Sequence, residues 1–230
     1  MNVIQHEVEP QSQASSEGTI VRVASQERSG AFIITKRLVQ CGFGVLVWPR
    51  LLLYWICRSL YGRKAFGASC ESIAKVPGMR GVHLRHAFYR KTLDRCGQDS
   101  YIGWNSVFSM PEACIARQVY IGRFCSIGYA DIGANVMLAD GVQILSGGRE
   151  HGQPTQSGGT MQAESQTYSQ VRIGDGTWVG AGAIIMADVG ENVVIGAGAV
   201  VNKPIPDGAV AVGVPARVVG TNAHPAPSST

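Results

Sequence analysis

Hydrophobic positions in the second half of the chain recur with a period of six residues. From Tyr101 onward an aliphatic or aromatic residue returns about every six positions, and glycine often follows it. The first block contains Ile102, Phe108, Ile115, Ile121, Ile127, Ile132, Leu138 and Ile144, and the second contains Ile173, Val179, Ile185, Val189, Ile195 and Val201. A smaller apolar residue often stands two positions earlier, and this alternation predicts short strands with one buried face.

The six-residue period also predicts how these strands assemble. Strand–turn units of this length stack as coils of a parallel β-helix, in which each coil buries its apolar edge against the next. A conventional α/β sheet is excluded, because strands six residues apart leave no room for crossover helices. The glycines that follow the apolar positions, such as Gly103 and Gly122, are expected to adopt a positive φ where the chain turns.

The pattern is different before residue 97. Residues 1–30 are rich in Gln, Ser and Glu, lack the apolar segment of a signal peptide, and predict a mobile tail. Residues 38–57 are mostly apolar and long enough for a membrane span, but Pro49 and Arg50 interrupt them. Residues 82–96 predict a short basic helix that ends before Gly97. Its basic side chains, Arg85, Arg90, Lys91 and Arg95, are expected to form a solvated face.

Charge is unevenly distributed along the chain. The net charge of +4 is too small for a dedicated nucleic-acid binder, yet residues 31–96 carry 12 basic and 2 acidic side chains, whereas residues 97–230 carry 6 and 10. The basic, aromatic and apolar residues of 31–64 therefore favour either an arm at an anionic lipid surface or an arm packed on the protein or on a neighbouring subunit. A true membrane span is a third alternative. The six cysteines form no C-x-x-C pair and favour reduced thiols in a cytosolic compartment.

One run of the sequence points to a known family. It covers residues 171–219 and reads VRIGDGTWVGAGAIIMADVGENVVIGAGAVVNKPIPDGAVAVGVPARVV. This run resembles the C-terminal half of hexapeptide-repeat acyltransferases, which include sugar and xenobiotic O-acetyltransferases. The resemblance covers residues 97–219 and implies an all-β, left-handed parallel β-helix, a homotrimer with active sites between subunits, and acetyl-CoA as the acyl donor. The chain then divides into a polar tail (1–30), a helical basic arm (31–96), the acyltransferase domain (97–219) and a flexible C-terminal tail (220–230).

A polar loop, residues 145–170, interrupts the repeat and contains the histidine of the coil region, His151. Transfer of an acyl group to a hydroxyl needs a base that removes the hydroxyl proton, and an imidazole suits this task. On the residues alone, a histidine in a polar loop is more often a solvated surface residue. The resemblance implies that His151 is the general base, oriented by Glu150, by a backbone carbonyl or by another acid.

The resemblance also implies a set of donor-binding positions. Those that match positions at which the family contacts coenzyme A are Ala181, Ala197, Asn202, Lys203 and Arg217. The two cations can meet phosphates, while the alternative is that these residues are only tight turns and solvated charges. Trp178 stands in a similar motif and either walls the thioester or acceptor pocket or packs between subunits.

Together these features predict a coenzyme A-dependent O-acyltransferase that acetylates a hydroxyl of a sugar or surface-polysaccharide precursor. The asparagine that sugar acetyltransferases of this superfamily place before the histidine is not found in IGRFCSIGYAD, so their sugar-binding residues cannot be transferred. The expected location is the cytoplasm, with peripheral contact at the inner membrane face, and no metal or nucleic acid is expected. Alternatives are an antibiotic acetyltransferase, a zinc hydratase, which would need about three histidines, and a non-catalytic β-helix scaffold.

Overall fold

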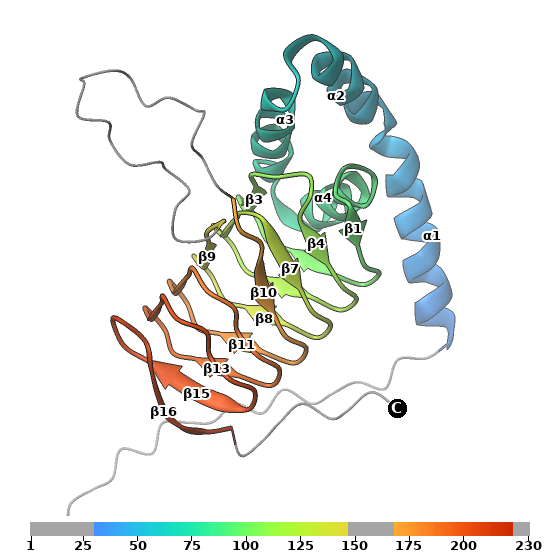
Figure 1. The fold of residues 1–230 in the computed structure, drawn as a ribbon. Coiled ribbons are helices and arrows are strands. Elements are labelled where there is room, and N and C mark those ends of the chain that lie inside the picture. Colours follow the sequence, from blue (N-terminus) through green and yellow to red (C-terminus); the bar gives the residue numbers. More distant parts are fainter. Residues whose placement is uncertain (1–29, 147–167, 223–230) are drawn as a thin grey trace, which may run out of the picture.

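A β-helix with a helical region at its N-terminal end forms the fold (Figure 1). The computed structural model describes residues 30–146 and 168–222. The helices are α1 (Gly30–Leu46), α2 (Trp48–Tyr61), α3 (Lys64–Ala74) and α4 (Gly78–Thr92). The helix expected over residues 82–96 is displaced toward the N-terminus. α4 begins at Gly78, and it ends at Thr92 because Arg95 and Cys96 instead form a strand that pairs with Cys114 and Ile115 of the next coil.

Three sheets form the sides of the β-helix, and all strand pairs between coils are parallel. Sheet A contains β1 (Arg95–Cys96), β4 (Cys114–Ile115), β7 (Ala130–Ile132) and β10 (Val171–Ile173). Sheet B contains β2 (Tyr101–Ile102), β5 (Tyr120–Ile121), β8 (Met137–Leu138), β11 (Trp178–Val179), β13 (Val194–Ile195), β15 (Ala209–Val212) and the antiparallel β16 (Arg217–Thr221). Sheet C contains β3 (Val107–Phe108), β6 (Ser126–Ile127), β9 (Gln143–Ile144), β12 (Ile184–Ile185) and β14 (Val200–Val201).

The residues of the six-residue period form the core of this β-helix. Each repeat residue lies beside the equivalent residue of the next coil, as Ile102 pairs with Ile121 and Ile121 with Leu138. All of these side chains are buried, because the pleat turns every second residue inward. The predicted parallel β-helix is confirmed.

The glycines that follow the repeat residues are needed for a reason that differs from the expected one. Gly103 and Gly122 do not have a positive φ. A Cβ atom on Gly103 would lie 2.2 Å from the backbone oxygen of Gly122, so a side chain there would collide with the next coil. The positive φ occurs two positions after the glycine, at exposed turn residues such as Asn105 (φ 59°) and Gly182 (φ 69°). The expectation was therefore wrong about which residue makes the turn.

Helix α4 covers the end of the β-helix at which no preceding coil is available for backbone pairing. Arg85 is fully buried, and its Nε donates to the Ile102 carbonyl of the first coil at 2.9 Å, while Nη1 donates to the Val76 carbonyl at 2.7 Å. Nε2 of His86 lies 3.0 Å from the Gly97 carbonyl oxygen. The expected solvated face was thus wrong for Arg85, which satisfies carbonyl groups that would otherwise be buried without a partner.

The arm formed by α1 and α2 packs on the protein through one side only. Val47, Leu51 and Tyr54 are buried within the core, whereas many large apolar side chains of both helices are exposed. Within the described residues, no single helix has the length and apolar character needed to cross a membrane. The pair formed by Arg37–Leu46 and Trp48–Tyr61, bent by 44°, meets those two requirements only when its members are taken together.

Candidate active site

The polar insertion leaves and re-enters the β-helix at a single point, the edge between sheets C and A (Figure 1). The backbone N–H of Ser169 donates to the carbonyl of Ser146 at 2.9 Å, which closes the base of the insertion. β10 then pairs in register with β7, so the coil order continues after the insertion. His151 lies outside the described residues, within 147–167, and its role as the general base stays a prediction.

The edge between sheets B and C carries backbone donors that the β-helix leaves unused. At the edge between sheets A and B, an aspartate of one coil accepts the turn N–H of the preceding coil: Asp175 binds Ala134 N, and Asp207 binds Glu191 N, each at 2.8 Å. At the B–C edge, Asp140 accepts Arg123 N in the same way at 2.7 Å.

The next two coils lack this cap. Ala181 and Ala197 occupy the equivalent turn positions, they are exposed, and their N–H groups have no hydrogen-bond partner among the described residues. The two turns lie on consecutive coils, since Gly198 N donates to the carbonyl of Ala181 at 2.8 Å. They therefore present two outward donors about 4.8 Å apart, the spacing of neighbouring strands.

A cavity of about 310 Å³ adjoins these turns. Its lining residues come from three consecutive coils and are Tyr120, Met137, Ala139, Asp140, Trp178 and Ala181. Tyr120, Met137 and Trp178 occupy equivalent positions on sheet B and face outward. The cavity therefore combines two aromatic walls with one carboxylate.

Arg123 holds that carboxylate in its ionised form. Nε and Nη2 of Arg123 both donate to Oδ2 of Asp140, at 2.9 and 2.7 Å. These hydrogen bonds lower the pKa of Asp140 below its ordinary value. At neutral pH Asp140 is consequently an acceptor of hydrogen bonds and not a proton donor.

The structure brings together some of the predicted donor-site residues and separates others. Three of them lie close together: Trp178 is in β11 of sheet B, and Ala181 and Ala197 lie on consecutive coils at the adjoining B–C edge. Arg217 begins β16 at the following coil, where its Nη1 donates to the carbonyl of Ala216 at 2.8 Å. Asn202 and Lys203 follow β14 and lie exposed at the C–A edge, the edge that carries the insertion. The roles of all these residues in binding stay predictions.

Sequence reasoning missed Asp140 and Tyr120. Asp140 lies 41 positions before Ala181 along the chain, and the insertion separates them. A signal was present: ADG at 139–141 and GAG at 180–182 each form the turn after a sheet B strand. Superposing the two blocks of the repeat would have placed Asp140 directly before Ala181 on one edge.

Comparisons with known proteins bear on the family and the fold of the chain. The family model described as bacterial transferase hexapeptide (six repeats) matches residues 170–203. The chain is 32% identical to a serine acetyltransferase of Bacillus pumilus over 164 residues, which is 66% of this chain and 68% of the relative. It is 33% identical to a serine acetyltransferase of Mycobacterium tuberculosis over 214 residues, which is 89% of this chain and 72% of the relative.

Two solved structures have the same β-helix. A maltose O-acetyltransferase from Clostridium difficile has a TM-score of 0.55 at 27% identity, covering 70% of this chain and 89% of its own. A galactoside acetyltransferase solved with coenzyme A has a TM-score of 0.56 at 24% identity, covering 72% and 84%, and this likeness concerns the fold. With its hexapeptide coils, its left-handed β-helix and these relatives, the chain belongs to the family of hexapeptide-repeat acyltransferases.

Proposed function

We propose that this protein is a coenzyme A-dependent O-acyltransferase that transfers an acetyl group to a hydroxyl of a sugar. The observation that carries the proposal is the pair of uncapped N–H groups of Ala181 and Ala197 beside the cavity at Trp178. The pantetheine arm of acetyl-CoA is an extended chain with amide carbonyls, which accept hydrogen bonds from such donors. Lys203 and Arg217 are exposed cations that suit the phosphates of the same substrate.

The cavity chemistry favours a sugar as the acceptor. Tyr120 and Trp178 offer aromatic faces against which the apolar side of a sugar ring packs, and Asp140 accepts hydrogen bonds from hydroxyls. A volume of about 310 Å³ suits one small ring. A sugar or glycan precursor of this kind also fits an enzyme that works in the cytoplasm, where acetyl-CoA is available.

The relatives supply a second candidate acceptor, the hydroxyl of free serine. Both serine acetyltransferases named above are more than 30% identical to this chain. An amino-acid acceptor needs a cation for its carboxylate. None of the residues that line the cavity is a cation, and Arg123, which contacts the cavity residue Asp140, already binds that carboxylate with two nitrogens. This pairing favours a sugar over serine as the acceptor.

The separation of the two edges supports a site shared between subunits. Ser146 and Ser169, between which the insertion runs, lie at the C–A edge, whereas the cavity and the uncapped turns lie at the B–C edge of the same chain. A cyclic homotrimer joins two unlike surfaces of neighbouring copies at each interface. In such a trimer the insertion of one subunit completes the cavity of the next.

In the proposed reaction His151 removes the proton of the acceptor hydroxyl as its oxygen attacks the thioester carbonyl carbon. The new C–O bond forms, the C–S bond breaks, and the imidazolium returns the proton to the departing thiolate. Backbone N–H groups at a turn stabilise the negative charge on the carbonyl oxygen during attack. No acyl-enzyme intermediate is required.

Release of free thiol from acetyl-CoA tests the function directly. The purified protein is assayed with simple sugars, nucleotide sugars, lipid-linked oligosaccharides, amino-sugar antibiotics and L-serine as acceptors. Turnover with one sugar class supports the proposal, turnover with the antibiotics indicates a xenobiotic acetyltransferase, and turnover with serine alone assigns the second candidate. A protein that neither binds coenzyme A nor consumes acetyl-CoA would be a scaffold and would refute the proposal.

The role of His151 is tested by substitution. His151→Ala should lower kcat by about 10²- to 10⁴-fold, with unchanged oligomeric state and unchanged affinity for coenzyme A. His224→Ala, in the predicted C-terminal tail, is the matched control and should retain full activity. Near-normal kcat in His151→Ala would show that another group is the base.

A further inference from the structure

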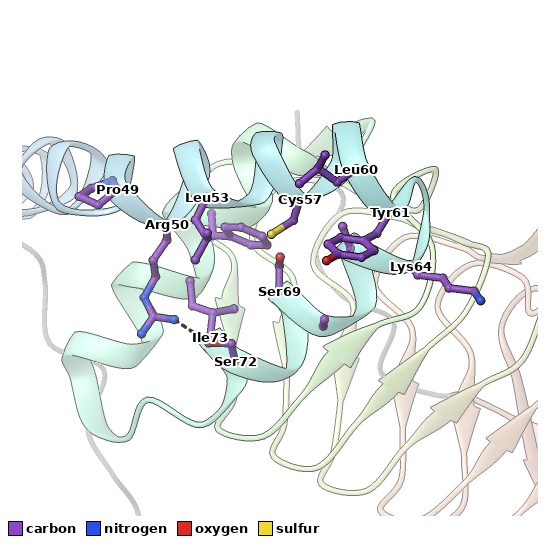
Figure 2. Close-up of a pocket in the computed structure, with 13 residues that line it drawn as sticks. Pro49, Arg50, Leu53, Cys57, Leu60, Tyr61, Lys64, Ser69, Ser72 and Ile73 are labelled. Carbon is purple, nitrogen blue, oxygen red and sulfur yellow. Dashed lines mark hydrogen bonds between the residues drawn. The ribbon is translucent and has the colours of Figure 1, made fainter.

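A deep groove lies between α2 and α3, far along the chain from the coils that form the candidate active site (Figure 2). Its volume is about 970 Å³, at the upper end of the range of about 300–1,000 Å³ for ligand pockets. Its lining includes the buried side chains of Ile73 and Phe88, and Leu53, Cys57 and Leu60 come from α2. Such a lining suits a hydrocarbon chain.

Cations lie at both ends of this groove. Figure 2 shows Arg50 at one end, where its Nη1 donates to Oγ of Ser72 at 3.1 Å, and Lys64 at the other. Neither cation pairs with a carboxylate within the described residues, and none of the groove residues is acidic. A ligand that combines a hydrocarbon chain with a negative head group therefore matches the groove in both respects.

The groove opens beside an apolar surface that continues along α1 and α2. The large apolar side chains exposed there are Leu38, Val39, Val45, Leu46, Trp48, Leu52, Leu53, Trp55, Ile56, Leu60 and Tyr61. An exposed apolar patch of this extent marks an interaction site. Tryptophan and tyrosine beside basic residues are typical of helices that lie in the head-group region of a membrane.

The distribution of charge decides between a lipid surface and a second copy of this chain. Residues 31–64, which form α1, α2 and the start of α3, carry six basic side chains and no acidic one. Two copies that docked through this face would bring these like charges together, whereas an anionic bilayer attracts them. The charge pattern therefore favours the bilayer.

We propose that the α2–α3 groove binds a hydrocarbon chain of an anionic phospholipid, with the cation at either end, Arg50 or Lys64, available to a lipid phosphate, and so holds the protein on an anionic membrane. This site is separate from the acyltransferase site and does not depend on the proposed function. Sugar precursors carried on lipid would then reach the enzyme in the plane of the same membrane.

Co-sedimentation of the full chain with lipid vesicles tests the proposal. The vesicles consist of phosphatidylcholine, either alone or with roughly 30 mol % of the anionic lipid phosphatidylglycerol, which gives them a negative surface charge. The double variant Arg50→Gln/Lys64→Gln should lower the partition coefficient about 25-fold, since each charge at an anionic surface contributes about fivefold. The matched control Lys75→Gln/Arg80→Gln removes two exposed cations outside the groove and should stay within about twofold of wild type.

A second pair of variants tests the groove itself. Ala68 is exposed and lines the groove, so Ala68→Phe fills it without disturbing the core. This variant should lower partitioning about tenfold, the equivalent of about two methylene groups kept in water. Met79→Phe, at an exposed position of α4 outside the groove, should bind as wild type does.

Three results would overturn the proposal. Equal losses in both charge variants would mean attraction to the whole basic segment without a site. Wild-type partitioning of Ala68→Phe, with helix content confirmed by circular dichroism, would mean that the groove stays empty. A change in oligomeric state of Arg50→Gln/Lys64→Gln in sedimentation velocity, without loss of vesicle binding, would assign the face to a second copy.

Discussion

Placing an aspartate at residue 197 should close the donor site by giving the β-helix the cap that it lacks there. On the preceding coils of the B–C edge, Asp140 accepts the N–H of Arg123, and Ala197 stands in the same relation to Ala181. The substitution Ala197→Asp therefore supplies a carboxylate where the proposed coenzyme A carbonyl binds. The side chain of Ala197 is exposed, so the core is not disturbed.

The three aspartate caps present in the structure indicate how large the effect on coenzyme A binding should be. Their N–H to carboxylate distances are 2.7, 2.8 and 2.8 Å, which are typical of charge-assisted hydrogen bonds. Such a bond contributes about 1.5–3 kcal/mol, and the ligand would have to replace it. The dissociation constant of coenzyme A should rise by about 10²-fold, while the free energy of unfolding stays the same or rises by about 1 kcal/mol.

Isothermal titration with coenzyme A measures the first quantity and urea denaturation the second. Asn192→Asp, on the same coil at the A–B edge, adds an equal charge away from the site and should bind coenzyme A as wild type does. Wild-type affinity in Ala197→Asp would refute the reasoning, because it would mean that the Ala181 N–H is not used. A strong loss of stability would refute the proposed equivalence of the turns.

Three further predictions concern the fold, each measured by urea denaturation at fixed protein concentration. Arg85→Met should lower the free energy of unfolding by about 3 kcal/mol, since the carbonyls of Val76 and Ile102 lose their donor, whereas Arg90→Met, at an exposed position of the same helix, should change it by less than about 0.5 kcal/mol. Gly180→Ala should cost about 2 kcal/mol, because its Cβ would lie 2.5 Å from the backbone nitrogen of Ala197; in contrast, Gly67→Ala, in α3 with open space around it, should stabilise the protein by about 0.5–1 kcal/mol. Burial lowers the pKa of His86 in the folded protein, so the unfolded chain takes up the proton first, and stability should fall as the pH drops below the ordinary value of 6.5. His86→Gln should lessen that fall, and identical slopes between pH 7.5 and 5.5 would contradict the assignment.

The coils could be predicted from the sequence because one physical requirement repeats in every one of them. Ile121 and Leu138 must each face inward and lie beside the equivalent residue of the next coil, so the period of six is visible without a structure. The reason for the glycines could not be obtained in this way. The contact of Gly103 with the backbone of Gly122 depends on the distance between coils, and a positive φ explains the same residue type equally well.

The role of Arg85 in covering the first coil could not be predicted from the sequence either. Arg85 belongs to a helix whose neighbouring basic residues, Arg90 and Lys91, are exposed, and nothing in the residue type distinguishes it from them. Its burial follows from the free carbonyl of Ile102, which exists only because the repeat begins at that coil. Ends of a repeat are determined by tertiary packing, and the period describes only its interior.

The candidate site can likewise be recognised by asking which backbone N–H groups of the turns have a hydrogen-bond acceptor. Along the A–B edge, aspartates 175 and 207 accept the turn N–H groups of the coils before them, and Asp140 does so at the B–C edge. The series stops at Ala181 and Ala197, although an aspartate would fit there. Each cap satisfies a donor that otherwise depends on water. The A–B edge also leaves some turn donors without a cap among the described residues, such as the N–H of Asp175, but no aromatic-walled cavity of this kind adjoins Asp175. Two open donors on consecutive coils, beside a cavity with aromatic walls, are therefore better explained by a ligand that supplies the missing acceptors.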